Sequence, residues 1–151
     1  MELSNSLPIA SLKKRVGAFV IDDIVVSLFL MIIFYDQITA SFANITVLDQ
    51  ESVQAMNTFI AENILIVFSV KILYHAILIW QSGMTFGKYI MKIKAVDYET
   101  GNRLSFFKAF LRAVLRIGSE VFFYTGFAMA WIMPLRQTFH DKLSNCVVID
   151  A

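Results

Sequence analysis

Cysteine is almost absent from this chain of 151 residues, because Cys146 is the only one. An internal disulfide and a cysteine-based metal site are therefore excluded, while the redox compartment stays undecided. Charge of one sign is also lacking: the formal net charge is +1, so no global basic field points to nucleic acid as a partner. No pairing of a nucleophile with a base is visible, and we expect no enzyme and no cofactor.

Apolar residues are abundant instead. Hydrophobic residue types make up 58% of the chain and aromatic residues 14%, and the mean hydropathy is +0.66. These values exceed what a water-soluble domain normally carries. The runs 16–35 and 63–81 are long enough to cross the hydrocarbon core of a bilayer as helices. The predicted fold class is an all-α membrane protein with a small cytoplasmic β element.

The chain is expected to form a single membrane domain, 1–151. A third apolar run contains Gly118, Gly126 and Pro134, so we expect a re-entrant segment or a hairpin there instead of a straight span. The predicted segments are a first transmembrane helix at 16–35, an outer loop at 36–62, a second transmembrane helix at 63–81, a cytoplasmic loop with an amphipathic helix at 82–116, a third membrane segment at 117–135 and a C-terminal tail at 136–151.

Basic residues are distributed unevenly. The segment 36–62 contains four acidic residues and no lysine or arginine, whereas basic residues fill 13–15 and recur seven times between 88 and 116. The bias of basic residues toward the cytoplasm predicts a multi-pass protein of the cell (inner) membrane with its N-terminus inside. The polar N-terminus is followed by no small-residue cleavage signature, which indicates an uncleaved anchor. Three simple crossings would place basic residues of the tail outside, so we favour a cytoplasmic C-terminus.

Two short strands also favour this topology. Residues 92–96 have the alternation of a strand and lead into the turn signal Glu99-Thr100-Gly101-Asn102. Residues 146–149 have strand composition, and the earlier strand is their natural partner. Because that strand lies inside, the C-terminus should lie inside too. Cys146 should then be protected from a membrane-impermeant maleimide in intact cells.

A helix with two chemically distinct faces is expected to begin at Ser105. Phenylalanine, leucine and valine side chains occupy one face, while Lys108, Arg112, Arg116 and Glu120 recur every fourth residue on the other. Such a basic stripe suits either lipid phosphate groups or buried acidic partners. The sequence leaves both alternatives open.

Two adjacent aspartates, Asp22 and Asp23, interrupt the first apolar run. Arg15 precedes Asp22 by seven residues, so these two side chains share one face of the helix. An isolated carboxylate at this depth costs about 2.5–3.5 kcal/mol on insertion scales. Asp22 therefore needs a partner or a water-filled pocket, whereas Asp23 is turned by about 100° and can face elsewhere.

The second apolar run offers partners for these aspartates. Lys71 and His75 lie four residues apart on one helix face, and a pairing of Asp22 with Lys71 is one expected arrangement. Glu120 reaches a similar depth if the third segment enters from the inside. The hypothesised intramembrane cluster consists of Asp22, Asp23, Lys71, His75 and Glu120, with Arg15 and Arg112 near its mouth.

Two interpretations of this cluster stay open. The charges can simply satisfy one another and orient the helices. Alternatively, Asp22 alternately binds a proton and a small cation, with Lys71 or His75 modulating its protonation. Two other motifs are set aside: 83–88 lacks a spacer and the final Ser/Thr of a nucleotide-binding loop, and His140-Asp141 lacks further metal ligands, which favours capping or hydrogen bonding.

The ordered motifs resemble the RDD family of small integral membrane proteins. Arg15 and Asp22 in RVGAFVIDD and Asp141 in QTFHDKLSNCVVID match the arginine and the two aspartates of its name. GMTFGKYIMKIKAVDYETGNRLS is similar to the family's Gly-x-Thr-x-Gly-Lys stretch with its following strand, and FLRAVLR, which contains Arg112, is similar to its helical arginine segment. The resemblance extends from Lys14 to Ile149 and departs after Asp141, where a small residue and a threonine are usual.

The resemblance implies transport, because monovalent cation/proton exchange is reported for some family members. We therefore expect an integral membrane protein that exchanges small monovalent cations for protons through an intramembrane carboxylate, with Arg15, Asp22 and Asp141 as its functional motif. Such a small chain should form a homo-oligomer or bind a membrane partner. The alternative is a non-enzymatic assembly or scaffold module that binds a protein partner or anionic lipid.

Overall fold

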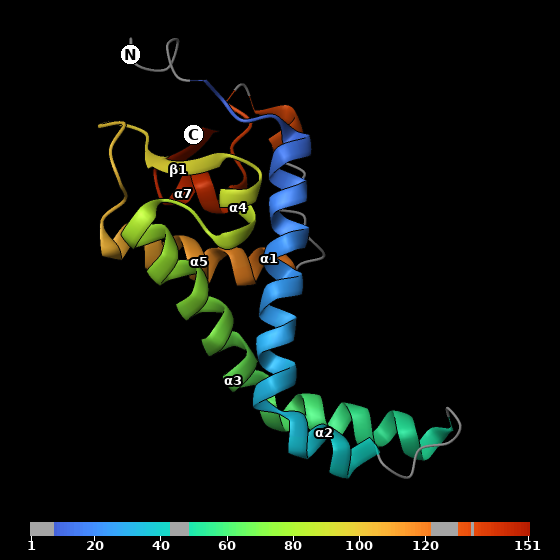
Figure 1. Ribbon diagram of the computed structural model, residues 1–151. Helices are drawn as coiled ribbons and strands as arrows, with labels where there is room; N and C mark the ends of the chain where they lie inside the picture. The colour runs from blue at the N-terminus through green and yellow to red at the C-terminus, as the bar shows by residue number, and fades with distance from the viewer. Residues whose placement is uncertain (1–7, 43–48, 122–129, 134) are drawn as a thin grey trace.

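The computed structural model describes residues 8–42, 49–121, 130–133 and 135–151. Most of this part of the chain is helical, with one small sheet (Figure 1). The elements are α1 (Leu12–Ile33), α2 (Tyr35–Phe42), α3 (Gln50–Ser82), α4 (Phe86–Ile90), β1 (Ile93–Asp97), α5 (Phe106–Val121), α7 (Phe139–Leu143) and β2 (Cys146–Asp150).

Two helices, α1 and α3, have the length and composition of membrane-crossing helices, with mean hydropathies of 2.4 and 1.8. This confirms the two apolar helices expected from the sequence, although both are longer than expected. Ser11 caps α1 by accepting a hydrogen bond from the Lys14 amide. Asp49 caps α3 in a reciprocal capping box with Ser52, which explains why this helix begins well before residue 63.

The outer region is helical on both sides of its undescribed stretch. Figure 1 shows α2 beside the first half of α3, away from the sheet, while the second half of α3 rises toward β1. Val53, Met56 and Ile60 follow the predicted helical spacing, but between 42% and 49% of each remains exposed. Their apolar face therefore does not pack within the described part of this chain.

The predicted pairing of the two strands is confirmed. β1 and β2 are antiparallel, in a register that runs from Ile93 opposite Asp150 to Asp97 opposite Cys146. Ile9 adds an antiparallel bridge to Ile149, so the first described residues lie along the last strand. The first described residues and the C-terminal strand consequently lie at the same end of the molecule (Figure 1).

The helix α5 lies across the molecule behind the second half of α3, against which it packs (Figure 1). Its two faces are distributed as expected, but the face turned inward is the basic one. Arg112 and Arg116 are 4% and 3% exposed, whereas Phe107 is 72% exposed. Of the two alternatives for the basic stripe, buried acidic partners are therefore correct.

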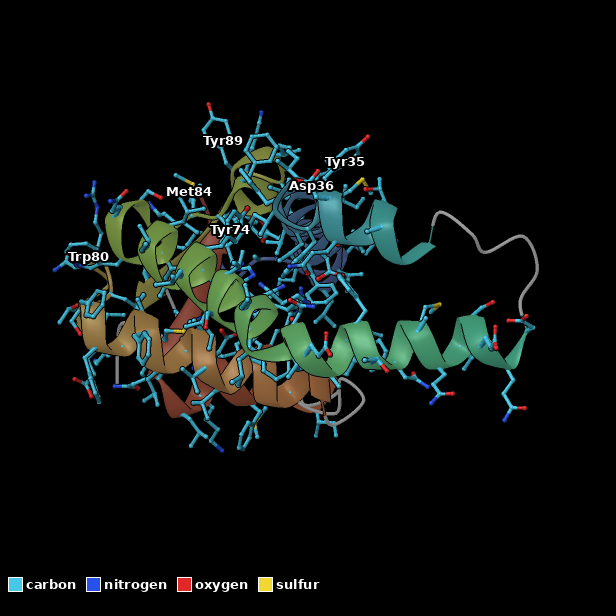
Figure 2. The ribbon with its side chains drawn as sticks, turned by 90° about the horizontal axis from the view of Figure 1, so that it is seen from below. Tyr35, Asp36, Tyr74, Trp80, Met84 and Tyr89 are labelled. Carbon is cyan, nitrogen blue, oxygen red and sulfur yellow. The ribbon has the colours of Figure 1, made fainter. Side chains whose placement is uncertain are left out.

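The helix α5 continues to Val121 without a break at Gly118, so it includes the first residues of the segment expected at 117–135. The helices α3 and α5 pack against each other. Trp80, which Figure 2 labels near the end of α3, meets Phe106 of α5 edge to face, with ring centroids 5.4 Å apart. Residues 122–129 and 134 of the expected third segment, which include Gly126 and Pro134, lie outside the described residues.

Candidate functional site

Asp22 is fully buried and accepts three hydrogen bonds. The Tyr74 hydroxyl and the Gly87 amide donate to Oδ1 over 2.9 and 2.8 Å, and the Thr85 hydroxyl donates to Oδ2 over 2.5 Å. The Lys88 ammonium lies 4.0 Å from Oδ2. The carboxylate thus takes the place of an anion at the start of α4, where backbone amides are unpaired.

The segment 83–88 is built to hold this carboxylate. Gly83 ends α3 in a left-handed conformation (φ 74°), and Thr85 caps α4. A Cβ at Gly87 would lie 2.1 Å from the Ala18 carbonyl oxygen, so only glycine allows α4 to approach α1 this closely. The motif that resembles a phosphate-binding loop therefore binds an aspartate of its own chain.

Asp141 is also buried, and arginines surround it. Arg112 donates to Oδ1 from Nε and Nη2 over 2.9 and 2.7 Å, and Arg15 donates to Oδ2 from Nη1 over 3.3 Å. The predicted capping role is confirmed, since Asp141 and Thr138 form a capping box at the start of α7. Burial alone would raise the pKa of Asp141, but the neighbouring Arg112 guanidinium outweighs it and holds that pKa well below its usual range.

A third group of charges lies between α1, α3 and α5. Lys71 donates to Asp23 over 3.1 Å and to Glu120 over 2.9 Å. Arg116 binds the other Glu120 oxygen over 3.1 Å, and its Nη1 lies 3.0 Å from Nδ1 of His75. The Asp23 side chain is 39% exposed.

The expected pairing of Asp22 with Lys71 is wrong. The 100° turn between the two aspartates directs Asp22 toward α4 and Asp23 toward Lys71. Arg15 likewise shares a helix face with Asp22 but binds Asp141. The single cluster expected from the sequence is thus three neighbouring groups, and Asp22 is absent from the one that contains Lys71.

The sequence did not reveal the four residues that surround the Asp22 carboxylate. Tyr74, Thr85 and Gly87 donate hydrogen bonds to it, and Lys88 faces it. A signal for three of them was present, because a threonine, a glycine and a lysine at this spacing provide a hydroxyl, an amide and an ammonium at one helix start. Because the segment lacks the full spacing and the final Ser/Thr of a nucleotide-binding loop, it was rejected as a nucleotide site, and its binding of Asp22 was not predicted. Tyr74 carried no such signal.

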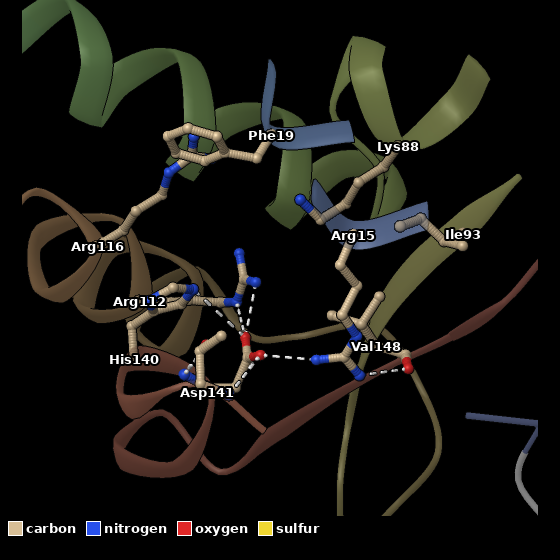
Figure 3. Close-up of a pocket in the computed structure, with 10 residues that line it drawn as sticks. Arg15, Phe19, Lys88, Ile93, Arg112, Arg116, His140, Asp141 and Val148 are labelled. Atoms are coloured by element: carbon tan, nitrogen blue, oxygen red, sulfur yellow. Dashed lines mark hydrogen bonds and ion pairs between the residues drawn. The ribbon is translucent and has the colours of Figure 1, made fainter. Parts of the chain in front are cut away.

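The Asp141 group borders a small cavity of about 30 Å³. Figure 3 shows its lining side chains, which come from α1, α4, β1, α5, α7 and β2. The lining residues are Arg15, Phe19, Lys88, Ile93, Arg112, Arg116, Thr138, His140, Asp141 and Val148. Arg15 and Asp141 thus meet at one pocket with Arg112, as expected, whereas Asp22 contacts it only through Lys88.

Burial changes the protonation of several groups here. It lowers the pKa of Lys88 to about 7, with a further contribution from Arg112, and it lowers the pKa of His140 to about 3. Burial raises the pKa of the Cys146 thiol to about 12. Cys146 is fully enclosed, so the expected maleimide test is unsuitable, because the reagent would not reach this thiol from either side.

No three His, Cys, Asp or Glu side chains among the described residues are arranged to hold a metal ion. What the arrangement does provide is a set of buried charges at one end of two apolar helices. These features define a helical membrane protein of small size with an internal ionic network.

The model of the RDD family matches residues 9–145, and the chain belongs to this family. Comparisons with curated proteins and with solved structures give no match. The resemblance carried by Arg15, Asp22 and Asp141 is thereby confirmed at the level of the family.

Proposed function

We propose that this RDD membrane protein exchanges small monovalent cations for protons through the carboxylates of Asp23 and Glu120. One observation carries the proposal: the Lys71 ammonium on α3 bridges the carboxylates of Asp23 on α1 and Glu120 on α5. Of these helices, α1 and α3 have membrane-spanning length. An intramembrane ionisable group is expensive, and such groups commonly mark ion pathways.

The proposal assigns ion exchange to Asp23 and not to Asp22, which the sequence alone had suggested. Asp22 has no exposure and accepts three hydrogen bonds, so a cation would have to displace α4 to reach it. Asp23 makes one ion pair and is 39% exposed, and Lys71 is 21% exposed. Access therefore favours Asp23.

In this proposal the Lys71 ammonium competes with the transported ion for the carboxylates of Asp23 and Glu120. A proton or a monovalent cation that binds one carboxylate neutralises it, and the ammonium then remains on the other carboxylate. Loss of the bound ion returns Lys71 to the shared position. Only one ion is bound at a time, because Lys71 supplies the charge that a second ion would supply.

Asp23 opens into a groove of about 280 Å³ on the outer face of α1. The groove is otherwise mostly apolar, with Val20, Ile24 and Leu28 among its lining residues. A carboxylate next to lipid would be costly. We therefore expect a second copy of the chain to cover this groove, so that the active form is a homo-oligomer.

The proposed orientation is multi-pass in the inner membrane, with both termini and the small sheet in the cytoplasm. It rests on the bias of basic residues and on the bridge between Ile9 and Ile149. Lys142 is exposed, so a Lys142→Cys variant should react with a membrane-impermeant maleimide only after cells are permeabilised. The native thiol of Cys146 does not react with the maleimide, because it is buried.

A proteoliposome assay tests the exchange. Na⁺ or K⁺ gradients are imposed, and proton movement is measured for wild type, Asp23→Asn and the control Asp36→Asn, whose carboxylate is exposed on α2. Flux that is lost in Asp23→Asn and retained in the control supports the proposal. Flux that persists in a folded Asp23→Asn protein refutes the site.

The second candidate is a non-enzymatic assembly module that binds a protein partner or anionic lipid. The enclosure of both family aspartates favours it, since fully satisfied charges fix a fold without needing a transported ion. Absence of flux from folded wild type, together with a stoichiometric copurifying partner, would support this candidate.

A further inference from the structure

The cavity beside Asp141 is surrounded by an unusual number of basic side chains. Arg15, Lys88, Arg112 and Arg116 all line it. Each of these side chains is at least nine-tenths buried, with exposed fractions of 8%, 8%, 5% and 4%. Buried cations are rare unless they are paired, so the partners of these four groups decide what the cavity can bind.

The guanidinium groups are partly paired. Arg112 directs two nitrogens to Asp141, and Arg116 directs one to Glu120. Arg15 binds Asp141 and two carbonyl oxygens, but its buried Nε has no hydrogen-bond partner. Donor capacity therefore remains at the cavity.

Lys88 is the least satisfied of the four. Its nearest acidic oxygen, on Asp22, is 4.0 Å away and beyond hydrogen-bonding distance. Figure 3 shows its ammonium pointing into the space between Arg15, Arg112 and Arg116. The carboxylate that faces Lys88 already accepts hydrogen bonds from three other donors.

The buried network also has unequal numbers of charges. Its basic members are Arg15, Lys71, Lys88, Arg112 and Arg116, and its carboxylates are Asp22, Asp23, Glu120 and Asp141. Five cations face four anions within the described residues, so one positive charge is left over. The excess lies at Lys88, whose ammonium makes no hydrogen bond to a carboxylate among the described residues and faces Asp22 at 4.0 Å.

We propose that this cavity binds one small inorganic anion, a halide or a small oxyanion, between the Lys88 ammonium and the free donors of Arg112 and Arg15. One monovalent anion balances the excess charge of the network. A volume of about 30 Å³ accommodates only one or two water-sized groups. An anion of the size of gluconate does not fit.

Binding is coupled to protonation of Lys88. The groups that face Lys88 are Arg15 and Asp22 from α1, His75 from α3, Arg112 and Arg116 from α5, and His140 and Asp141 from α7. Burial and Arg112 lower the pKa of Lys88 to about 7 in the empty cavity. An anion favours the charged ammonium, so binding above pH 7 takes up a proton, and affinity falls as pH rises.

The test uses the purified full chain in detergent and gluconate buffer. Calorimetric titrations with sodium chloride and with sodium nitrate, whose anions stay monovalent throughout, are performed at pH 6.5 and 8.5. We expect saturable binding of at least one of these anions, about 20-fold weaker at pH 8.5 when the charged lysine is required. Proton uptake on binding should be measurable at pH 8.5.

Lys88→Met is the informative variant, and the exposed Lys142→Met is its matched control. Lys88→Met removes the excess charge, so it should stay folded, which size-exclusion chromatography and the melting temperature check. We expect at least tenfold weaker binding in Lys88→Met and unchanged binding in Lys142→Met. Undiminished binding in Lys88→Met, absence of saturable heat in wild type, or an equal response to added gluconate would each overturn the proposal. None of these results depends on cation flux.

Discussion

Asp22 and Asp23 are neighbours in the sequence, yet they occupy opposite situations. Asp22 has no exposed surface and accepts hydrogen bonds from Tyr74 on α3, from the α4 cap Thr85 and from the amide of Gly87 in α4. Asp23 is 39% exposed and forms an ion pair with Lys71. A helix turn of 100° separates the two environments. The comparison teaches that the family aspartate of α1 fixes the fold, while the adjacent aspartate is free to change its partner.

The largest expected effect comes from removing the enclosed carboxylate. Asp22→Ala leaves the Tyr74 hydroxyl, the Thr85 hydroxyl and the Gly87 amide without their acceptor and Lys88 without its facing carboxylate. We expect a loss of about 3–5 kcal/mol in the free energy of unfolding. Asp23→Ala should cost about 1 kcal/mol or less, because its ion pair is partly exposed. Unfolding in detergent measures both. Equal losses would abolish the distinction between the two aspartates.

The next effect concerns the approach of α4 to Asp22. Gly87→Ala places a Cβ against the Ala18 carbonyl, and we expect a loss of about 3 kcal/mol from the forced separation of α1 and α4. Gly118→Ala is the matched control, because a Cβ there meets open space on α5 and should stabilise the helix by about 0.5–1 kcal/mol. The melting temperatures of the two variants should therefore change in opposite directions.

A smaller effect isolates one donor to Asp22. Tyr74→Phe removes the hydroxyl at 2.9 Å from Oδ1 and retains the ring. We expect a loss of about 1.5–3 kcal/mol, as is usual for a hydrogen bond to a charged group. In the double variant Tyr74→Phe/Asp22→Asn the loss attributable to the tyrosine should shrink. An additive pair of losses would mean that the hydroxyl acts through another contact.

The smallest effect sharpens the description of Asp23. A double-mutant cycle of Lys71→Met with Asp23→Asn should give a coupling of about 0.5 kcal/mol, since both side chains retain solvent access. The cycle of Lys71→Met with Glu120→Gln should give a larger coupling, because Glu120 is only 11% exposed. The test compares the two coupling energies. A larger coupling with Asp23 than with Glu120 would mean that the main partner of Lys71 is Asp23 on α1.

Sequence reasoning located the helices because apolar runs and capping residues are local signals. Strand composition predicted the pairing of β1 with β2, and the early start of α3 has a local cause as well, namely the capping box of Asp49. Local signals also identified every member of the Lys71 group except Arg116, which was placed only in the basic stripe of α5. What spacing did not give was helix rotation, and this determines which of two adjacent aspartates faces Lys71.

The sequence also did not determine that the basic face of α5 points into the protein, because this again depends on the rotation of a helix. A basic stripe has equal spacing whether it meets lipid phosphates or carboxylates, and only the location of Asp141 and Glu120 in space decides between them. The role of Gly87 was likewise invisible, because a glycine in a short motif does not indicate which backbone it approaches.

The contact between Arg15 and Asp141 spans 126 positions of the chain, and that between Lys14 and Asp150 spans 136. During biosynthesis α1 emerges before the residues that complete its ionic network. A chain interrupted before residue 141 would contain both apolar helices but would leave the guanidinium groups of Arg15 and Arg112 without the carboxylate of Asp141. The first helix therefore acquires the contacts of Arg15 with Asp141 and Val148 only after α7 and β2 have been synthesised and have folded back onto it.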